Sequence, residues 1–553
     1  MSAKRERRCY TASTGLMRTL VLALALALAL QGQPSKTKPA EVDRIFSAFN
    51  THTPGCAVGV AYQGAVALRS GYGMADLERD VPITADTVFE SGSVAKQFTA
   101  TALLLLAQQG KISLDDPMRK YLPELPDYGK PLTIRQVLSH ISGLREWRLV
   151  AKFSGIPEDT YVLGNRDLLQ IASRQRALNF DPGTAYSYTN TGFNIATILI
   201  ERALGNGKTF QDFTREAIFE PLKMTHTRWR DDFRAVVPSR ALAYTSAGGG
   251  WIQDTPIENI IGAGGMLSTV GDWLLWNENF THAKVGGSEL VKALQTPATL
   301  ANGKTIAYAA GLEIGTVDGL REVSHGGSTG GYRTWIGRYP DQAVSVAVMC
   351  NAAQANPAQL GRETARLWTG AVAAPKPAPF ALDPSKLQAV TGMYRKVRDN
   401  TVVELRLKDG KLTLDQRVEL TPTGSSTFLA GERQFVFEDS RFREVTPDGD
   451  TVYERVEPAH PSEPELASLA GEYGSPETGA TLTVAARAGE LTLAIASNPA
   501  VRLRPTFRDG FMIEDRSATS IRFIRDSAGN VTGLSAGDDR VWDLRFVRVR
   551  ARH

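Results

Sequence analysis

The sequence predicts an α+β protein in which a large mixed domain is followed by two small antiparallel β-barrel domains. Helical and strand patterns alternate up to about Gly370, and a segment rich in proline and alanine follows. Beyond it the chain consists of short alternating runs punctuated by Asp-Gly and Ala-Gly, which are hairpin signals. With 553 residues, 42% hydrophobic and 22% charged, the chain is long enough for several globular domains.

The N-terminus has the features of a signal peptide, which we place at residues 1–33. Basic residues between Lys4 and Arg18 precede the apolar run "TLVLALALALAL", which is too short to span a membrane comfortably. A retained anchor is the alternative. We therefore expect an exported protein, in the periplasm or outside the cell, with no stable membrane span after signal cleavage.

The mixed domain is expected over residues 40–370. "GCAVGVAYQGAVALRSGYG", from Gly55, is typical of a hairpin, and "REVSHGG", "YRTWIGRYP" and "VSVAVMCN" indicate three successive strands near the domain's end. Between them, "SVAKQFTATALLLLAQQG" predicts a helix that opens near Ser93 and ends at Gly110. Its middle is apolar all round, so it should be buried. The pattern implies one sheet built from both ends of the domain.

The tail repeats itself. We read residues 371–385 as a linker and predict β-barrels at 386–457 and 465–553. Leu387, Gly392 and Tyr394 recur as Leu466, Gly471 and Tyr473, all with an offset of 79 residues. Each copy has room for about eight short strands, and closing them into a barrel removes exposed edges.

Composition excludes several classes of function. The net charge is +4 and the positive residues are scattered, so we expect no nucleic-acid partner. His52, His226 and His282 have no ligand-like spacing, so we predict no metal and no cofactor. Cys9 would leave with the signal, and Cys56 and Cys350 could form one bridge or remain two buried thiols.

The stretch "ESGSVAKQFTA" carries the first chemical signal. On a helix, Ser93 and Lys96 lie one turn apart on the same face. A serine hydroxyl needs a base to become a nucleophile, and a buried lysine either finds partners or loses its proton. Taken alone, the pair could equally be an N-cap serine followed by a surface lysine.

Two further motifs accompany this pair: Tyr188 and Asn190 form Y-x-N ahead of a helix, and His325 and Gly327 delimit H-x-G on a strand. Together with phrases such as "LTIRQVLSHISGL" and "GAGGMLSTVGDW", they resemble the serine β-lactamase and penicillin-binding protein superfamily. The resemblance implies a β-lactamase/transpeptidase-like domain, with an antiparallel sheet flanked by helices and a helical subdomain. The barrels add a three-domain layout resembling that of D-aminopeptidases.

The resemblance also implies roles for these residues. Ser93 would be the nucleophile, Lys96 its proton-handling neighbour, and Tyr188 a general base or proton relay whose phenolate a cationic Lys96 would favour. Asn190 would bind the substrate or Lys96, and the backbone N–H groups of Ser93 and Ser328 would form an oxyanion hole. His325 and Gly327 would belong to the strand along which substrate lies. In this fold the strands that hold Cys56 and Cys350 would be antiparallel neighbours.

His325 departs from the lysine that most β-lactamases and D-Ala carboxypeptidases carry. Because histidine is mostly neutral near pH 7, strict dependence on a substrate carboxylate is doubtful. We expect a serine hydrolase that acts on an amide bond of a D-amino-acid-containing peptide, as a D-aminopeptidase or D-Ala carboxypeptidase-like enzyme. A carboxylesterase or weak β-lactamase is the alternative within the class, and a non-catalytic cell-wall peptide receptor is the alternative outside it. The oligomeric state is left open.

Two other features have plainer interpretations. "GGSTG", Gly326 to Gly330, matches the G-x-S-x-G of α/β-hydrolases, but that motif requires a helix after it and a strand follows here. His140 has no acid or nucleophile beside it, so we interpret it as structural.

Overall fold

The computed structural model describes residues 37–157, 161–375, 377–431, 433–515 and 517–549. The predicted signal peptide, residues 1–33, lies outside them. Helix α2, Thr37–Ile45, belongs to a compact unit that ends at Ala48, and every other described element belongs to a second unit that begins at Phe49. Within the described residues, no helix has the length and apolar character that crossing a membrane requires.

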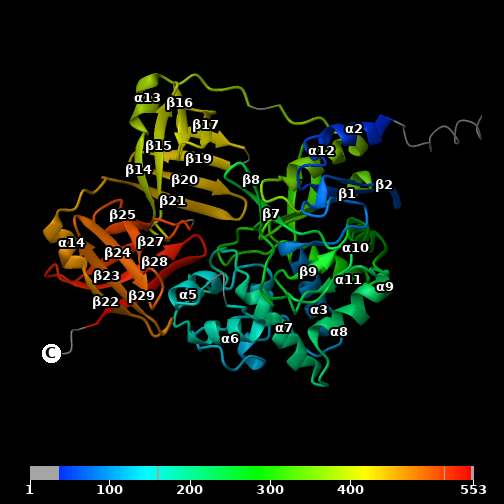
Figure 1. The fold of residues 1–553 in the computed structure, drawn as a ribbon, viewed down its shortest axis with the longest axis horizontal. Coiled ribbons are helices and arrows are strands. Elements are labelled where there is room, and N and C mark those ends of the chain that lie inside the picture. The colour runs from blue at the N-terminus through cyan, green and yellow to red at the C-terminus, as the bar shows by residue number, and fades with distance from the viewer. Residues whose placement is uncertain (1–36, 158–160, 376, 432, 516, 550–553) are drawn as a thin grey trace, which may run out of the picture. The chain divides into compact units, whose positions relative to one another are not determined.

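The first domain is built on a six-stranded antiparallel sheet that joins both ends of that domain (Figure 1). In order across the sheet, the strands are β10 Glu313–Val317, β11 Leu320–Thr329, β12 Tyr332–Tyr339, β13 Val344–Cys350, β1 Cys56–Tyr62 and β2 Ala65–Tyr72. The N-terminal hairpin and the three C-terminal strands expected from the sequence are confirmed. β1 and β13 are neighbours, with Cys56 opposite Cys350, and these two residues form a disulfide.

Helices cover this sheet and form a subdomain beside it. α10 packs on β1 and β13, and α12 packs on β12 and β13. The helix bounds are α3 Lys96–Gln108, α4 Ile134–Leu138, α5 Trp147–Phe153, α6 Asn165–Arg174, α7 Thr191–Leu204, α8 Phe210–Thr214, α9 Glu220–Leu222, α10 Val270–His282, α11 Gly287–Leu294 and α12 Pro357–Thr369. α3 lies against α7 and α11. Ten of its thirteen residues are buried, as its apolar sequence predicts.

Short strands and single turns connect these elements. The strands are β3 Met74–Asp76, β4 Val81–Pro82, β5 Phe89–Glu90, β6 Arg228–Trp229, β7 Tyr244–Ala247, β8 Gly250–Gln253 and β9 Met266–Ser268. The turns are 3-10 helices at Gly92–Ala95, Met118–Lys120 and Pro340–Gln342 and a π-helical turn at Arg215–Phe219.

The tail forms two closed barrels of eight strands each (yellow and orange to red in Figure 1). The first follows α13, Pro384–Ala389, and contains β14 Gly392–Lys396, β15 Val402–Lys408, β16 Lys411–Leu414, β17 Val418–Pro422, β18 Thr427–Ala430, β19 Arg433–Glu438, β20 Arg441–Thr446 and β21 Gly449–Val456. The second follows α14, Glu463–Leu469, and contains β22 Gly471–Gly474, β23 Thr481–Arg487, β24 Glu490–Ile495, β25 Val501–Pro505, β26 Gly510–Ile513, β27 Ser520–Arg525, β28 Val531–Asp538 and β29 Val541–Arg548.

The barrels repeat one internal contact, which supports their duplication. Tyr394 and Tyr473, equivalent in the sequence repeat, are both fully buried. Each hydroxyl donates to the carbonyl four residues earlier, at 3.1 Å to Val390 O and 2.6 Å to Leu469 O. Equivalent tyrosines therefore make the same hydrogen bond at the start of each barrel.

The second barrel is docked on the helical subdomain through α5. Leu149 and Phe153 of α5 belong to the apolar core of the barrel, with the Phe153 ring 5.6 Å from that of Phe546. Directly before α5, the buried Arg145 pairs with the buried Glu477 of the barrel at 2.6 Å. Apolar burial and a buried ion pair therefore join the two domains at one place.

Candidate active site

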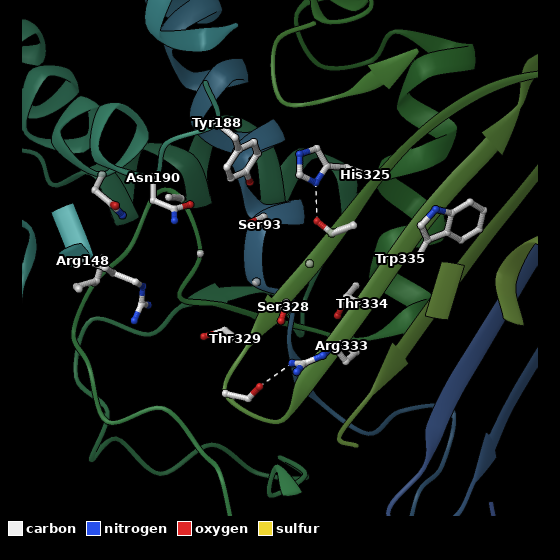
Figure 2. A pocket seen from close by; sticks show the side chains of 18 of the residues that line it. Ser93, Arg148, Tyr188, Asn190, His325, Ser328, Thr329, Arg333, Thr334 and Trp335 are labelled. Atoms are coloured by element: carbon white, nitrogen blue, oxygen red, sulfur yellow. Dashed lines mark hydrogen bonds between the residues drawn. The ribbon is translucent and has the colours of Figure 1, made fainter. Parts of the chain in front are cut away.

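Ser93 lies in a tight turn directly before α3, where two backbone segments approach each other closely. Gly92 has φ +54°, and a Cβ there would lie 2.6 Å from Ser328 N. A Cβ on Gly327 would lie 2.0 Å from Ser91 O. Only glycine fits at these positions, and the approach brings β11 against the serine turn. In Figure 2, Ser93 lies between Tyr188 and Asn190 on one side and Ser328 on the other.

Lys96, in the first turn of α3, is fully buried and contacts three oxygen atoms. Its Nζ lies 3.1 Å from Ser93 Oγ and donates to Asn190 Oδ1 at 2.7 Å and to Ala263 O at 2.9 Å. Burial lowers the pKa of Lys96 well below its usual 10.5, against an opposing contribution from the charge of Glu146. The structure therefore favours the neutral amine.

These contacts determine where the lone pair of a neutral Lys96 points. A backbone carbonyl only accepts, and Asn190 Oδ1 also accepts, so two N–H bonds are used on these two atoms. The third direction, toward Ser93 Oγ, is then left to the lone pair. A neutral Lys96 is thus oriented to accept the hydroxyl proton of Ser93.

Tyr188 lies in the loop before α7, with its ring 4.8 Å from Lys96 Nζ. Burial raises the pKa of Tyr188 well above its usual value, although the Ser93 hydroxyl and the Arg540 guanidinium oppose the shift. Burial thus opposes the phenolate that a cationic Lys96 would favour, because it raises the pKa of Tyr188 and lowers that of Lys96. The role of Tyr188 as general base or proton relay stays a prediction.

Glu146 positions Asn190, a role that no motif in the sequence indicates. Its Oε1 accepts from Asn190 Nδ2 at 3.1 Å, and its Oε2 accepts from the Asn190 backbone N–H at 2.6 Å. Because a carboxylate only accepts, the first bond assigns the amide nitrogen and turns Asn190 Oδ1 toward Lys96. Glu146 follows the phrase "LSHISGL" closely in sequence, but no local pattern marks it as facing residue 190.

His325 lies on β11, and both of its ring nitrogens are occupied. Nδ1 lies 2.6 Å from Gly326 O, and Nε2 lies 2.9 Å from the hydroxyl of Tyr308. Since the carbonyl only accepts, Nδ1 carries the proton and Nε2 accepts from Tyr308. Burial lowers the pKa of His325 to about 3, and the charge of Lys96 adds to this shift. His325 is therefore a neutral residue that shapes the strand and offers no cation to substrate.

His140 packs against the other face of this cluster. Its ring centroid lies 4.2 Å from that of Tyr188, and its Nδ1 accepts from Thr189 N at 3.2 Å. Burial lowers the pKa of His140 well below its usual value, so the ring is neutral. The histidine supports Tyr188 by packing.

A cavity of about 660 Å³ opens over Ser93 and collects all but one of the predicted site residues. Its lining includes Ser93, Tyr188, Asn190, His325, Gly327 and Ser328. Lys96 lies beneath it. Ser328 lies within β11, which is followed by another strand, β12, so the helix that the α/β-hydrolase motif requires is missing there. Among the described residues, no group of three or more His, Cys, Asp or Glu could hold a metal ion.

Arg540, at the tip between β28 and β29, brings the second barrel into this cavity. Its guanidinium carbon lies 4.9 Å from the centroid of the Tyr188 ring. The residue falls in the tail segment "DSAGNVTGLSAGDDRVWDLRFVRV", which resembles the closing segment of D-aminopeptidases, but its sequence does not reveal which residue meets the site. Arg540 and Tyr188 are far apart in the sequence, so no local pattern predicts their contact.

A family model described as Beta-lactamase matches residues 42–370, more than half of the chain. The chain belongs to the Beta-lactamase family. This membership makes the protein a serine hydrolase, and its two barrels add a D-aminopeptidase-like layout to the Beta-lactamase domain.

Similar proteins include two D-aminopeptidases. One, from Gluconobacter oxydans, is 31% identical over 313 residues, which is 56% of this chain and 58% of that protein. The other, from Brucella melitensis, is 27% identical over 531 residues, which is 91% of this chain and 96% of that protein. An octameric penicillin-binding protein homologue from Pyrococcus abyssi has the same fold, with a TM-score of 0.55 and 21% identity over 76% of this chain and all of that chain.

Proposed function

We propose that this Beta-lactamase family member hydrolyses an amide bond in a peptide that contains a D-amino acid, through an acyl-enzyme at Ser93. The D-aminopeptidases that it resembles support the substrate class. The observation that carries the reaction type is the set of contacts at Lys96, which point a neutral amine at the Ser93 hydroxyl.

Acylation follows from this geometry. Lys96 takes the proton of Ser93 as Ser93 Oγ forms a bond to the carbonyl carbon of the substrate amide. The carbonyl oxygen becomes an oxyanion, which the backbone N–H groups of Ser93 and Ser328 stabilise. Lys96 is now cationic, and Asn190 Oδ1 and Ala263 O, which already accept from it, hold that charge.

Collapse of the tetrahedral intermediate requires a proton on the leaving nitrogen. Tyr188 has a neutral hydroxyl and lies beside both Ser93 and Lys96, so it can donate its proton to the nitrogen and regain one from Lys96. The C–N bond breaks and the amine leaves. A water molecule then attacks the carbonyl carbon of the acyl-enzyme as Lys96 or Tyr188 takes its proton. The bond between that carbon and Ser93 Oγ breaks, the proton is passed on to Ser93 Oγ, and the acid product leaves.

The test compares purified full-length protein with Ser93→Ala on D-Ala-p-nitroanilide, p-nitrophenyl butyrate and nitrocefin. We expect turnover of the anilide that Ser93→Ala abolishes, and a fluorophosphonate adduct located on Ser93 by mass spectrometry. Ser468→Ala, at an exposed serine of α14, is the matched control and should behave as wild type. Absence of turnover and of any adduct would leave the receptor alternative.

Ester hydrolysis is a second candidate, and the neutral His325 favours it. A strand without a cation makes no demand for a carboxylate near the scissile bond, so a neutral ester would be accepted. Faster turnover of p-nitrophenyl butyrate than of the anilide, lost in Ser93→Ala, would support the esterase.

We also infer that the protein is exported. The basic and apolar leader supports this, and so does the bridge between Cys56 and Cys350, because disulfides persist mainly in oxidising compartments. Fractionation of producing cells, with N-terminal sequencing of the mature chain, tests it. A chain found inside the cell with an intact leader would contradict export.

A further inference from the structure

Basic side chains surround the cavity over Ser93, with Lys96 beneath it and Arg148, Arg333 and Arg540 in its lining, and they differ in what they contact. Lys96 is buried and uses its bonds on Asn190 and Ala263. Arg148 pairs with Glu258 at 3.2 Å. The remaining two are Arg333, whose guanidinium donates to Gly330 O at 2.6 Å and Tyr332 O at 2.7 Å, and Arg540.

Arg540 is exposed, and its guanidinium makes no hydrogen bond or ion pair with any part of the chain that the structure describes. It stacks on the ring of Tyr188 and leaves its five N–H donors unused. Glu313 also lines the cavity. A permanently charged guanidinium thus lines the cavity over Ser93, with no hydrogen bond or ion pair to the described residues.

Hydrogen bonds from two sides hold the backbone at Arg540, so they fix the position from which its side chain extends. Asp538 Oδ1 accepts from the backbone N–H groups of Arg540 at 2.8 Å and Val541 at 2.7 Å. Arg540 O accepts from Asn179 Nδ2 at 2.8 Å and from the Glu146 backbone N–H at 3.3 Å. The barrel hairpin is therefore bound to the loops that carry the active site.

The acidic neighbours of Arg540 are engaged elsewhere. Asp538 accepts from the hairpin backbone, as described. Asp539 pairs with Lys396 of the first barrel and lies 3.5 Å from Arg398. These contacts turn both carboxylates to other partners and leave the charge of Arg540 for a ligand.

We propose that Arg540 is a specificity residue that binds a carboxylate of the substrate, so that the preferred substrates are amides bearing an anionic group. The proposal rests on the proposed function of the same site. His325 supplies no cation on the strand, whereas the second barrel supplies one over the ring of Tyr188. A substrate with a free ammonium group near Arg540 would be repelled, unlike one with a carboxylate, which forms a charge-assisted bidentate contact.

The test uses two matched pairs of substrates that differ in charge and hardly in shape. Acetyl-D-Ala-D-Ala and its C-terminal amide place the charge in the leaving group. Succinyl-D-Ala-p-nitroanilide and its succinamoyl counterpart place it in the acyl part. We expect wild type to favour the carboxylate member of at least one pair by about tenfold in kcat/KM, a modest factor because the arginine is exposed.

Arg540→Gln should abolish this preference, and Arg540→Lys should keep part of it. Arg540→Glu should instead favour the cationic D-Ala-p-nitroanilide. Arg545→Gln is the control, since Arg545 is an exposed arginine of the same barrel that pairs with Asp543 and does not line the cavity. Thermal unfolding of each variant checks that the barrel remains folded.

The same pairs are titrated calorimetrically into Ser93→Ala and into Ser93→Ala/Arg540→Gln, which makes the outcome independent of turnover. Tighter binding of the carboxylate member, lost with Arg540→Gln, supports the proposal. Equal affinity for the two members, or a preference that survives Arg540→Gln, overturns it. If no substrate is turned over, the proposed function fails and the titration alone decides the role of Arg540.

Discussion

Lys96 is the residue whose protonation controls the proposed reaction. Because burial lowers its pKa well below 10.5, we expect kcat/KM to rise with pH along an acidic limb that reports its deprotonation. Activity is lost as the pH falls through this limb, because the cationic lysine can no longer accept the proton of Ser93. A pH profile of kcat/KM measures the limb.

Glu146→Gln provides a sharper test of the protonation of Lys96. The charge of Glu146 raises the pKa of Lys96 against the larger effect of burial, so its removal should shift the acidic limb to lower pH. We also expect kcat to fall by about tenfold, because Asn190 loses a charged acceptor. Glu124→Gln, at an exposed carboxylate paired with Arg202, should leave the limb in place. A limb that moves to higher pH in Glu146→Gln would contradict the assignment.

Gly92→Ala should disrupt the site through the backbone. The added Cβ would lie 2.6 Å from Ser328 N at a positive φ of +54°, so the serine turn and β11 must separate. We expect activity to fall by about a hundredfold if one oxyanion donor is displaced. Gly110→Ala, with φ +69° and no atom within 4 Å, should cost only about 1 kcal/mol of stability and keep activity. Equal activity in the two variants would count against this explanation.

At the scale of elements, the disulfide between the neighbouring strands β1 and β13 joins the N-terminal hairpin to the C-terminal strands of the sheet across a sequence separation of 294 residues. Closing so long a loop restricts the unfolded chain, so we expect the Cys56→Ala/Cys350→Ala variant to lose about 2–4 kcal/mol of unfolding free energy. Urea unfolding measures the loss. A midpoint unchanged from that of the oxidised wild type would show that strand pairing alone holds β1 and β13 together.

At the scale of the molecule, Arg145 couples the second barrel to the catalytic domain. Arg145→Ala leaves Glu477 buried without its cation, which should cost about 3–5 kcal/mol. We expect the barrel to dock less firmly and the preference attributed to Arg540 to weaken, measured by unfolding and by the charged substrate pairs. Arg202→Ala removes an exposed pair with Glu124 and should cost about 1 kcal/mol or less. Equal losses in the two variants would contradict a role for the buried pair.

Much of the fold was predictable because its signals are local. The buried helix after Ser93, the hairpins of the tail and the repeat offset of 79 residues are all properties of neighbouring residues or of direct comparison along the chain. The motif residues Ser93, Tyr188 and His325 were named from spacing and resemblance, and the fold gathers them around one cavity.

The sequence by itself determined the element types, the duplicated barrels and the residue types needed for a serine nucleophile. Only the tertiary structure decided that burial lowers the pKa of Lys96 and raises that of Tyr188, that Glu146 orients Asn190, and that Arg540 faces the site. The physical reason is that residues a few positions apart set whether a segment forms a helix or a strand. The burial of a side chain and the electrostatic environment that shifts its pKa depend on groups brought together from distant parts of the chain. Arg540 reaches Tyr188 across more than 300 residues of sequence, a contact that only folding creates.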